Sequence, residues 1–90
     1  MDTMISEKMT FDRARALVRE AFAYVLPERN AEAPSIPLTA TVDVLGIQSV
    51  QALEMVGYVE DKLTVYFADD DVLKIVRLGD LVALIMKHAS

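Results

Sequence analysis

The sequence predicts an all-α fold, a small antiparallel four-helix bundle with a long first loop and a short third helix. Three segments carry apolar residues at helical spacing. Only one short segment, 64–67, has the composition of a β-strand, and it has no second strand with which to pair. With 90 residues, 53% of them hydrophobic, the chain is long enough for one domain with a compact core.

The first helix is expected to begin after Thr10, a favourable N-cap residue, and to end near Leu26, before Pro27. Its apolar face consists of Phe11, Ala14, Val18, Ala21 and Val25. Residues 1–9 show no periodicity, so we expect them to form a loose leader, with residues 10–90 as the folded domain.

The segment 27–48 is expected to be a long connection without helices. Pro27, Pro34 and Pro37 interrupt it, and its apolar residues follow neither a helical nor an alternating period. Several apolar side chains could nevertheless anchor the loop across the bundle. These are Ile36, Leu38, Val42, Val44, Leu45 and Ile47.

The second helix is expected over residues 49–63. Its inward side is expected to consist of residues that lie along neighbouring turns. This set is Val50, Leu53, Val56, Gly57, Glu60 and Leu63. The segment 64–67 then forms a connector that buries Val65 or Phe67.

Two shorter helical segments complete the predicted fold. Residues 69–71, all aspartates, are expected to cap a short third helix that reaches Ile75. The last helix has the clearest periodicity, with apolar residues at Leu78, Leu81, Val82, Ile85 and Met86. Lys87 and His88 lie near its negative end, where a cation is favourable.

Charge and composition disfavour several classes of function. The net charge of −5, from 14 acidic and 9 basic residues, makes binding to nucleic acids or anionic membranes unfavourable. The chain contains no cysteine, which excludes disulfides, thiolate metal sites and a cysteine nucleophile. No segment has the pattern of a signal peptide or a membrane span. We therefore expect a cytoplasmic monomer.

Ser49 stands where a glycine-containing loop meets an acidic amphipathic helix. A helix N-terminus offers unpaired N–H groups and a positive dipole end, so an anionic ester on this serine would be stabilised. The stretch 43–60 resembles the signature of acyl carrier proteins around their phosphopantetheinylated serine. The resemblance is carried by Asp43, Leu45-Gly46, Ser49, Leu53-Glu54-Met55-Val56 and Val59-Glu60.

This resemblance implies a freestanding acyl carrier protein, not an enzyme, with 4′-phosphopantetheine attached to Ser49. A phosphopantetheinyl transferase would attach the group, whose thiol would carry acyl intermediates of fatty-acid, polyketide or related specialised biosynthesis. The other implied partners are acyl-loading, condensing and acyl-transfer enzymes with basic docking surfaces. Their expected docking residues are Gln48, Val50, Glu54, Met55, Glu60 and Asp61.

The chain departs from the family pattern next to the serine and within the second helix. Gln48 and Val50 stand where acyl carriers usually have Asp and Leu. Gly57 replaces a larger apolar residue, which indicates either a role at an inner cavity or tight packing against a bulky neighbour such as Phe22 or Tyr24.

Other functions remain open on the sequence. A peptidyl or aminoacyl carrier would usually show Gly-Gly-x-Ser, which the segment before Ser49 does not match. An unmodified helical interaction domain would use Ser49 only as a helix cap. A Ser-His-Asp enzyme using His88 lacks the Gly-x-Ser-x-Gly turn, and residues 69–71 lack the ligand spacing of a calcium loop.

Overall fold

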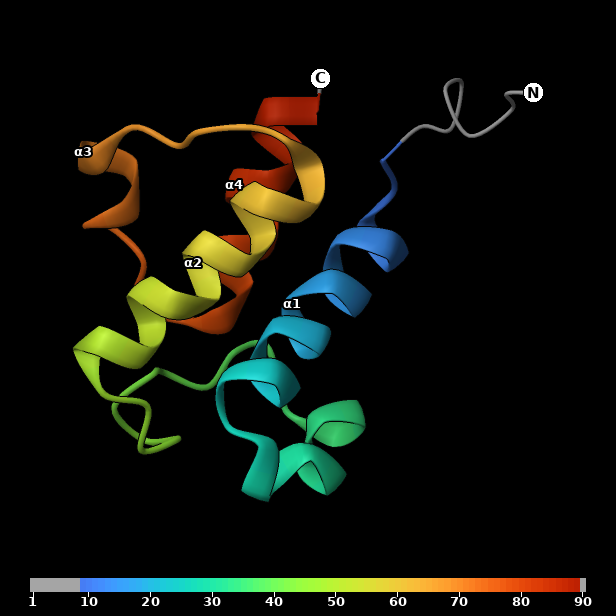
Figure 1. The fold of residues 1–90 in the computed structure, drawn as a ribbon, viewed down its shortest axis with the longest axis vertical. Helices are drawn as coiled ribbons and strands as arrows, with labels where there is room; N and C mark the ends of the chain where they lie inside the picture. The colour runs from blue at the N-terminus through green and yellow to red at the C-terminus, as the bar shows by residue number, and fades with distance from the viewer. Residues whose placement is uncertain (1–8, 90) are drawn as a thin grey trace.

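The computed structural model describes residues 9–89. Five helical segments make up most of this part of the chain, and it contains no strand (Figure 1). They are α1 (Phe11–Val25), η2 (Pro27–Ser35), α2 (Ser49–Leu63), α3 (Asp69–Val72) and α4 (Leu78–Ala89). The all-α prediction is confirmed, and α1, α2 and α4 occupy the predicted positions.

The N-terminus of α1 forms as its sequence predicts, and three residues of the predicted apolar face, Ala14, Val18 and Ala21, are buried. The Oγ1 atom of Thr10 accepts a hydrogen bond from the backbone N–H of Arg13 at 3.1 Å, which confirms Thr10 as the N-cap. Phe11 is exposed and lies under the guanidinium of Arg15 instead of in the core. The buried residues of α1 are Ala14, Val18, Ala21 and Phe22.

The expectation that segment 27–48 lacks helices is wrong for its first nine residues. Pro27–Ser35 forms η2, a 3₁₀ segment that is kinked at Arg29 and begins with a proline. Short i to i+3 turns need no 3.6-residue periodicity, and a proline is tolerated in a first turn because its missing N–H has no partner there. Apolar periodicity therefore could not predict η2.

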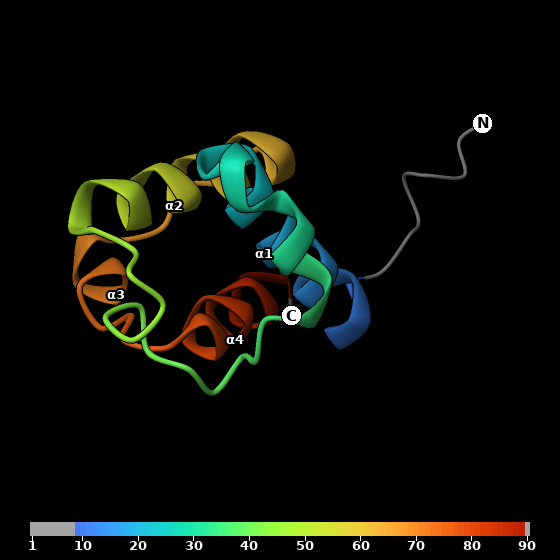
Figure 2. The same cartoon turned by 90° about the horizontal axis from the view of Figure 1, so that it is seen from below.

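The rest of this connection runs past the start of α4 towards the start of α2 (Figure 2). Its backbone is held by hydrogen bonds from Gly79 N–H to the Leu38 carbonyl at 2.8 Å and from Val42 N–H to the Val76 carbonyl at 2.9 Å. Ile36 and Ile47 are buried, which confirms them as anchors. Val44 is exposed, so the prediction for that residue is wrong.

The connection between α2 and α4 buries Phe67, as predicted, and its backbone N–H donates to a Glu60 carboxylate oxygen at 2.8 Å. The third helix is shorter than expected, since α3 ends at Val72. Its N-cap is Ala68, and no side chain caps it, so the capping role predicted for the three aspartates is wrong. They occupy the first turn instead, where the helix dipole favours them.

The core lies between α1, α2 and α4, and α1 contacts η2, α2 and α4. Met9 packs against this core. It was assigned to the loose leader 1–9, whose other residues lie outside the described part of the chain. Among residues 9–89, no helix is long and apolar enough to cross a membrane.

Candidate functional site

Ser49 is the first residue of α2, and its side chain is exposed. Gln48 occupies the N-cap position, and its backbone N–H donates to Gln51 Oε1 at 2.8 Å. Within residues 9–89 the Ser49 hydroxyl has no hydrogen-bond partner. The interpretation of Ser49 as a plain helix cap is therefore wrong, because its hydroxyl caps nothing and is accessible for chemistry.

A tight turn at Gly46 precedes Ser49. Gly46 has φ +74°, a conformation that glycine adopts without strain, and its N–H donates to the Asp43 carbonyl at 3.0 Å. The next N–H, from Ile47, donates to the Val42 carbonyl at 2.9 Å, and the Ile47 side chain is buried. Together these contacts fix the direction in which α2 begins.

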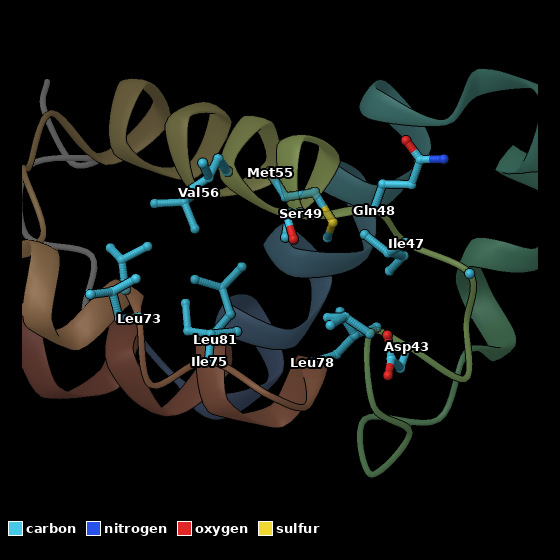
Figure 3. Close-up of a pocket in the computed structure, with 15 residues that line it drawn as sticks. Asp43, Ile47, Gln48, Ser49, Met55, Val56, Leu73, Ile75, Leu78 and Leu81 are labelled. Atoms are coloured by element: carbon cyan, nitrogen blue, oxygen red, sulfur yellow. The ribbon is translucent and has the colours of Figure 1, made fainter.

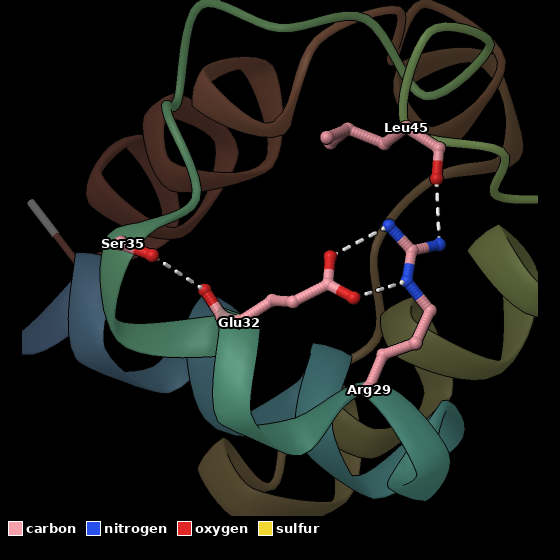
Figure 4. A network of polar contacts seen from close by, with 4 residues as sticks. All are labelled: Arg29, Glu32, Ser35 and Leu45. Carbon is pink, nitrogen blue, oxygen red and sulfur yellow. Dashed lines mark hydrogen bonds and ion pairs between the residues drawn. The ribbon is translucent and has the colours of Figure 1, made fainter.

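Arg29, which the sequence analysis missed, holds this turn from η2 (Figure 4). Its Nη1 donates to the Leu45 carbonyl at 2.7 Å, while Nε and Nη2 donate to the two Glu32 carboxylate oxygens at 3.1 and 3.0 Å. The hydrogen-bonded guanidinium holds the pKa of the Glu32 carboxyl below its usual range. The i, i+3 spacing of Arg29 and Glu32 hints at their ion pair, but no sequence signal indicates the contact with Leu45.

An open apolar cavity of about 600 Å³ lies beside Ser49 (Figure 3). Its walls come from Met55 and Val56 of α2, from Leu78 and Leu81 of α4, and from the segment that follows α3. Its polar lining residues include Asp43, Gln48 and Ser49. The exposed serine thus lines a space whose other walls are mostly apolar.

The structure places the predicted docking residues in three settings: at the Ser49 cavity, at a second hollow and, for Val50, on the exposed first turn of α2. Gln48 and Met55 line the Ser49 cavity, but Met55 is only 2% exposed, so the expectation that a partner docks on it is wrong. A long apolar side chain at this point fills the interior and cannot lie on a docking surface. The three acidic residues line a separate hollow on another face of α2. They are Glu54, Glu60 and Asp61.

Gly57 lines the same hollow. A Cβ atom at this position would meet nothing within 4 Å, so the expected tight packing against Phe22 or Tyr24 is wrong. A glycine in a helix interior is less stable than an alanine, and here no neighbour requires it.

The outside of the Ser49 cavity is mainly apolar. The first turn of α2 contains no acidic residue, although the exposed Asp43 lines the cavity. Val50 and Leu53 are 59% and 57% exposed, although the periodicity predicted both for the inward side. Leu73, which lines the cavity, is also exposed, as is Val44. A partner that reaches Ser49 would therefore meet a mainly apolar surface with one carboxylate.

His88 and the aspartates at 69–71, the other groups considered for catalysis or metal binding, do not line the Ser49 cavity. The His88 ring contacts the Phe67 ring edge-on, with centroids 4.7 Å apart. Over residues 9–89, no three His, Cys, Asp or Glu side chains lie close enough together to hold a metal ion.

A comparison of the chain with protein-family models, with curated proteins and with solved structures finds no match.

Proposed function

We propose that this chain is an acyl carrier protein that bears 4′-phosphopantetheine on Ser49 and has no catalytic activity of its own. The observation that carries this proposal is the position of one hydroxyl, exposed and without a hydrogen-bond partner in residues 9–89, beside a mostly apolar cavity whose lining includes Ser49. In this proposal the helices form the antiparallel four-helix bundle of a cytoplasmic carrier, with η2 inserted in its first loop.

The residues around Ser49 suit a phosphate ester. Backbone N–H groups of the first turn of α2 lack carbonyl partners within the helix, and the helix dipole favours an anion there. No acidic side chain in that turn would repel the phosphate. When bound, the group would supply the thiol for thioester formation, which this cysteine-free chain lacks.

The cavity suits an apolar cargo better than an aminoacyl group. Its walls include Met55, Val56, Leu78 and Leu81, and each methylene moved from water into such surroundings contributes about 0.8 kcal/mol. Fatty-acyl or reduced polyketide chains therefore fit the proposal. Its partners are a phosphopantetheinyl transferase and enzymes that load, condense and transfer acyl groups, which would contact Gln48 and Val50 beside the serine.

Intact-mass measurement tests the modification. The protein is incubated with coenzyme A, Mg²⁺ and a broad-specificity phosphopantetheinyl transferase, and we expect the mass of one phosphopantetheine group to be added. Ser49→Ala should gain none, whereas the matched control Ser35→Ala, an exposed serine in η2, should gain one. Addition to Ser49→Ala would overturn the assignment, and so would the absence of addition to the parent protein.

A second candidate, an unmodified interaction domain, is favoured by exposed apolar side chains at the cavity and at positions next to its lining residues in the sequence. Leu53 and Leu73 line the cavity, and Val44, Val50 and Val76 are neighbours of Asp43, Ser49 and Ile75. Exposed apolar side chains of this kind suit an apolar segment of a partner without any covalent group. The same measurement separates the two, since an interaction domain would keep its original mass in every sample.

A further inference from the structure

The peptide unit between Leu45 and Gly46, three residues before Ser49, is held at both of its ends. The Leu45 carbonyl accepts a hydrogen bond from Arg29 Nη1 at 2.7 Å, and the Gly46 N–H donates to the Asp43 carbonyl at 3.0 Å. A peptide unit is planar, so these two bonds together fix the orientation of its plane. Gly46 and Ser49 line the same cavity, and the plane therefore belongs to the wall that carries the serine.

Gly46 is the residue that most needs such a restraint. Its φ is +74°, and glycine adopts positive and negative φ with similar ease, so a free glycine here would let the chain enter α2 in more than one direction. A Cβ atom on Gly46 would lie 3.8 Å from Arg29 Nη1, which places the guanidinium directly against the glycine. Among residues 9–89, Arg29 provides the only hydrogen bond to the Leu45 carbonyl.

Arg29 is itself held in one orientation. One edge of its guanidinium donates to both carboxylate oxygens of Glu32, at 3.1 and 3.0 Å, which leaves Nη1 for the turn. Its plane lies over the ring of Phe22, 5.2 Å from the ring centroid, and Phe22 is fully buried on α1. A guanidinium can make these contacts at once because its donors lie in a fixed plane, which a lysine ammonium does not offer. Arg29 therefore ties the turn before Ser49 to α1 and η2.

We propose that Arg29 is a positioning residue for the modification of Ser49, and that it acts by holding the Leu45–Gly46 peptide unit. This inference rests on the proposed function. In that reaction the serine oxygen would bond to the phosphorus next to the pantetheine arm of coenzyme A. The bond from that phosphorus to adenosine 3′,5′-bisphosphate would break, and the hydroxyl proton would pass to a base of the transferase. A displacement of the reacting oxygen by about 1 Å can slow such a step about 100-fold.

Kinetics of phosphopantetheine transfer test this role. The proteins compared are the parent, Arg29→Gln, Arg29→Lys and the matched control Arg15→Gln. Arg15 also donates to a carboxylate three residues away, that of Asp12, and lies over a phenylalanine ring, but it makes no contact with the turn. We expect kcat to fall about tenfold or more in Arg29→Gln and several-fold in Arg29→Lys, with KM within about twofold of the parent. The control should match the parent.

The division between kcat and KM separates positioning from docking. If Arg29 only attracted the transferase by its charge, Arg29→Gln would raise KM and leave kcat unchanged, and Arg29→Lys would behave as the parent. Either result would overturn the proposal.

Hydrogen exchange of the unmodified, ¹⁵N-labelled protein tests the restraint without any transferase. We expect the Gly46 and Ile47 amides to exchange about fivefold faster or more in Arg29→Gln, with Arg15→Gln as the parent. The Leu81 amide in α4 should be unchanged in both variants, which verifies the fold. Unchanged exchange at Gly46 in Arg29→Gln would overturn the proposal.

The kinetic experiment also separates this inference from the function on which it rests. A parent protein that takes up no phosphopantetheine would overturn both. A parent that is modified no faster than Arg29→Gln would leave the carrier function in place and overturn this inference alone.

Discussion

α2 and α4 both border the Ser49 cavity, yet they use their apolar residues in different ways. The apolar stripe of α4 lies in the core, with Leu81 and Ile85 almost fully buried. α2 buries only Met55, Val56 and Val59, and leaves Val50 and Leu53 exposed. Helical periodicity is the same kind of signal in both, but the apolar stripe predicted for α4 is buried or half-buried throughout, whereas two residues of the stripe predicted for α2 are exposed. α2 packs with one face, and its other faces bear the exposed Ser49 and the hollow lined by Glu54, Gly57 and Asp61.

The N-termini of α2 and α4 also differ, in the side chains that accept backbone N–H groups there. At the start of α4, one Asp80 carboxylate oxygen accepts the N–H groups of Val76 and Arg77 at 2.8 and 2.9 Å. At the start of α2, the Ser49 hydroxyl accepts no N–H group from residues 9–89. In both helices the third residue accepts an N–H group that precedes the first turn, the charged Asp80 in α4 and the neutral Gln51 in α2, so only α4 carries its own anion at its positive end.

The largest expected difference in stability is between two leucine-to-alanine variants, one in α4 and one in α2. Leu81→Ala should lower the free energy of unfolding by about 2–5 kcal/mol, because it removes a buried side chain and enlarges a cavity. Leu53→Ala should cost about 0.5 kcal/mol or less, since this side chain is more than half exposed. Urea unfolding at pH 7 measures both. Equal losses would show that Leu53 is part of the core and remove the contrast between the helices.

The sequence predicts those parts of the fold that local chemistry determines. Thr10 and Pro27 mark the two ends of α1, and Gly46 predicts the turn that precedes Ser49. η2 was not predictable from periodicity, because 3₁₀ turns do not require a repeating apolar pattern. Within η2, the Arg29 guanidinium contacts the Leu45 carbonyl. The two residues are 16 positions apart, and no local pattern predicts such a contact.

The position of Ser49 was predictable from the sequence, but the orientation of the α2 residues around it was not. Ser49 lies at the predicted start of α2, because the glycine turn before it and the helical pattern after it are local signals. Which side of α2 faces inward depends on how α1, α4 and the loop pack around it, so Met55 and Leu53 exchanged their expected roles. The second hollow, at Gly57, needs Tyr24 from α1, so it too follows from tertiary packing.

A second, smaller difference in stability is expected between variants at the N-termini of α4 and α2. Asp80→Asn should destabilise the protein by about 0.3–1 kcal/mol at pH 7, because it removes a charge at the positive end of α4. Ser49→Ala should change stability by less than about 0.5 kcal/mol, since it loses no cap. Urea unfolding of each variant beside the parent measures this. A loss in Ser49→Ala as large as that in Asp80→Asn would show that the serine does cap α2.

The Asp80 effect should depend on pH in one direction. Its bonds from the Arg77 and Val76 N–H groups hold the pKa of Asp80 below the ordinary value of 3.8. The folded state therefore binds this proton less readily than the unfolded state, so the stabilisation is present above the ordinary pKa and is lost as the pH falls through the lowered one. The gap between parent and Asp80→Asn should close below that pKa. A gap that widens with acid would contradict this origin.

A last difference in stability is expected between two glycines, one in each helix. Gly57→Ala should stabilise the protein by about 0.5–1 kcal/mol, because alanine favours a helix and the added Cβ meets nothing within 4 Å. At Gly79 the added Cβ would lie 3.2 Å from the Leu38 carbonyl oxygen, which Gly79 N–H also contacts at 2.8 Å. Alanine there must push the loop away, so Gly79→Ala should gain less than Gly57→Ala or lose stability. Thermal unfolding of the two variants under one set of conditions compares them directly. A larger gain at Gly79 would mean that the loop yields easily, and that α4 is not the more tightly packed of the two helices.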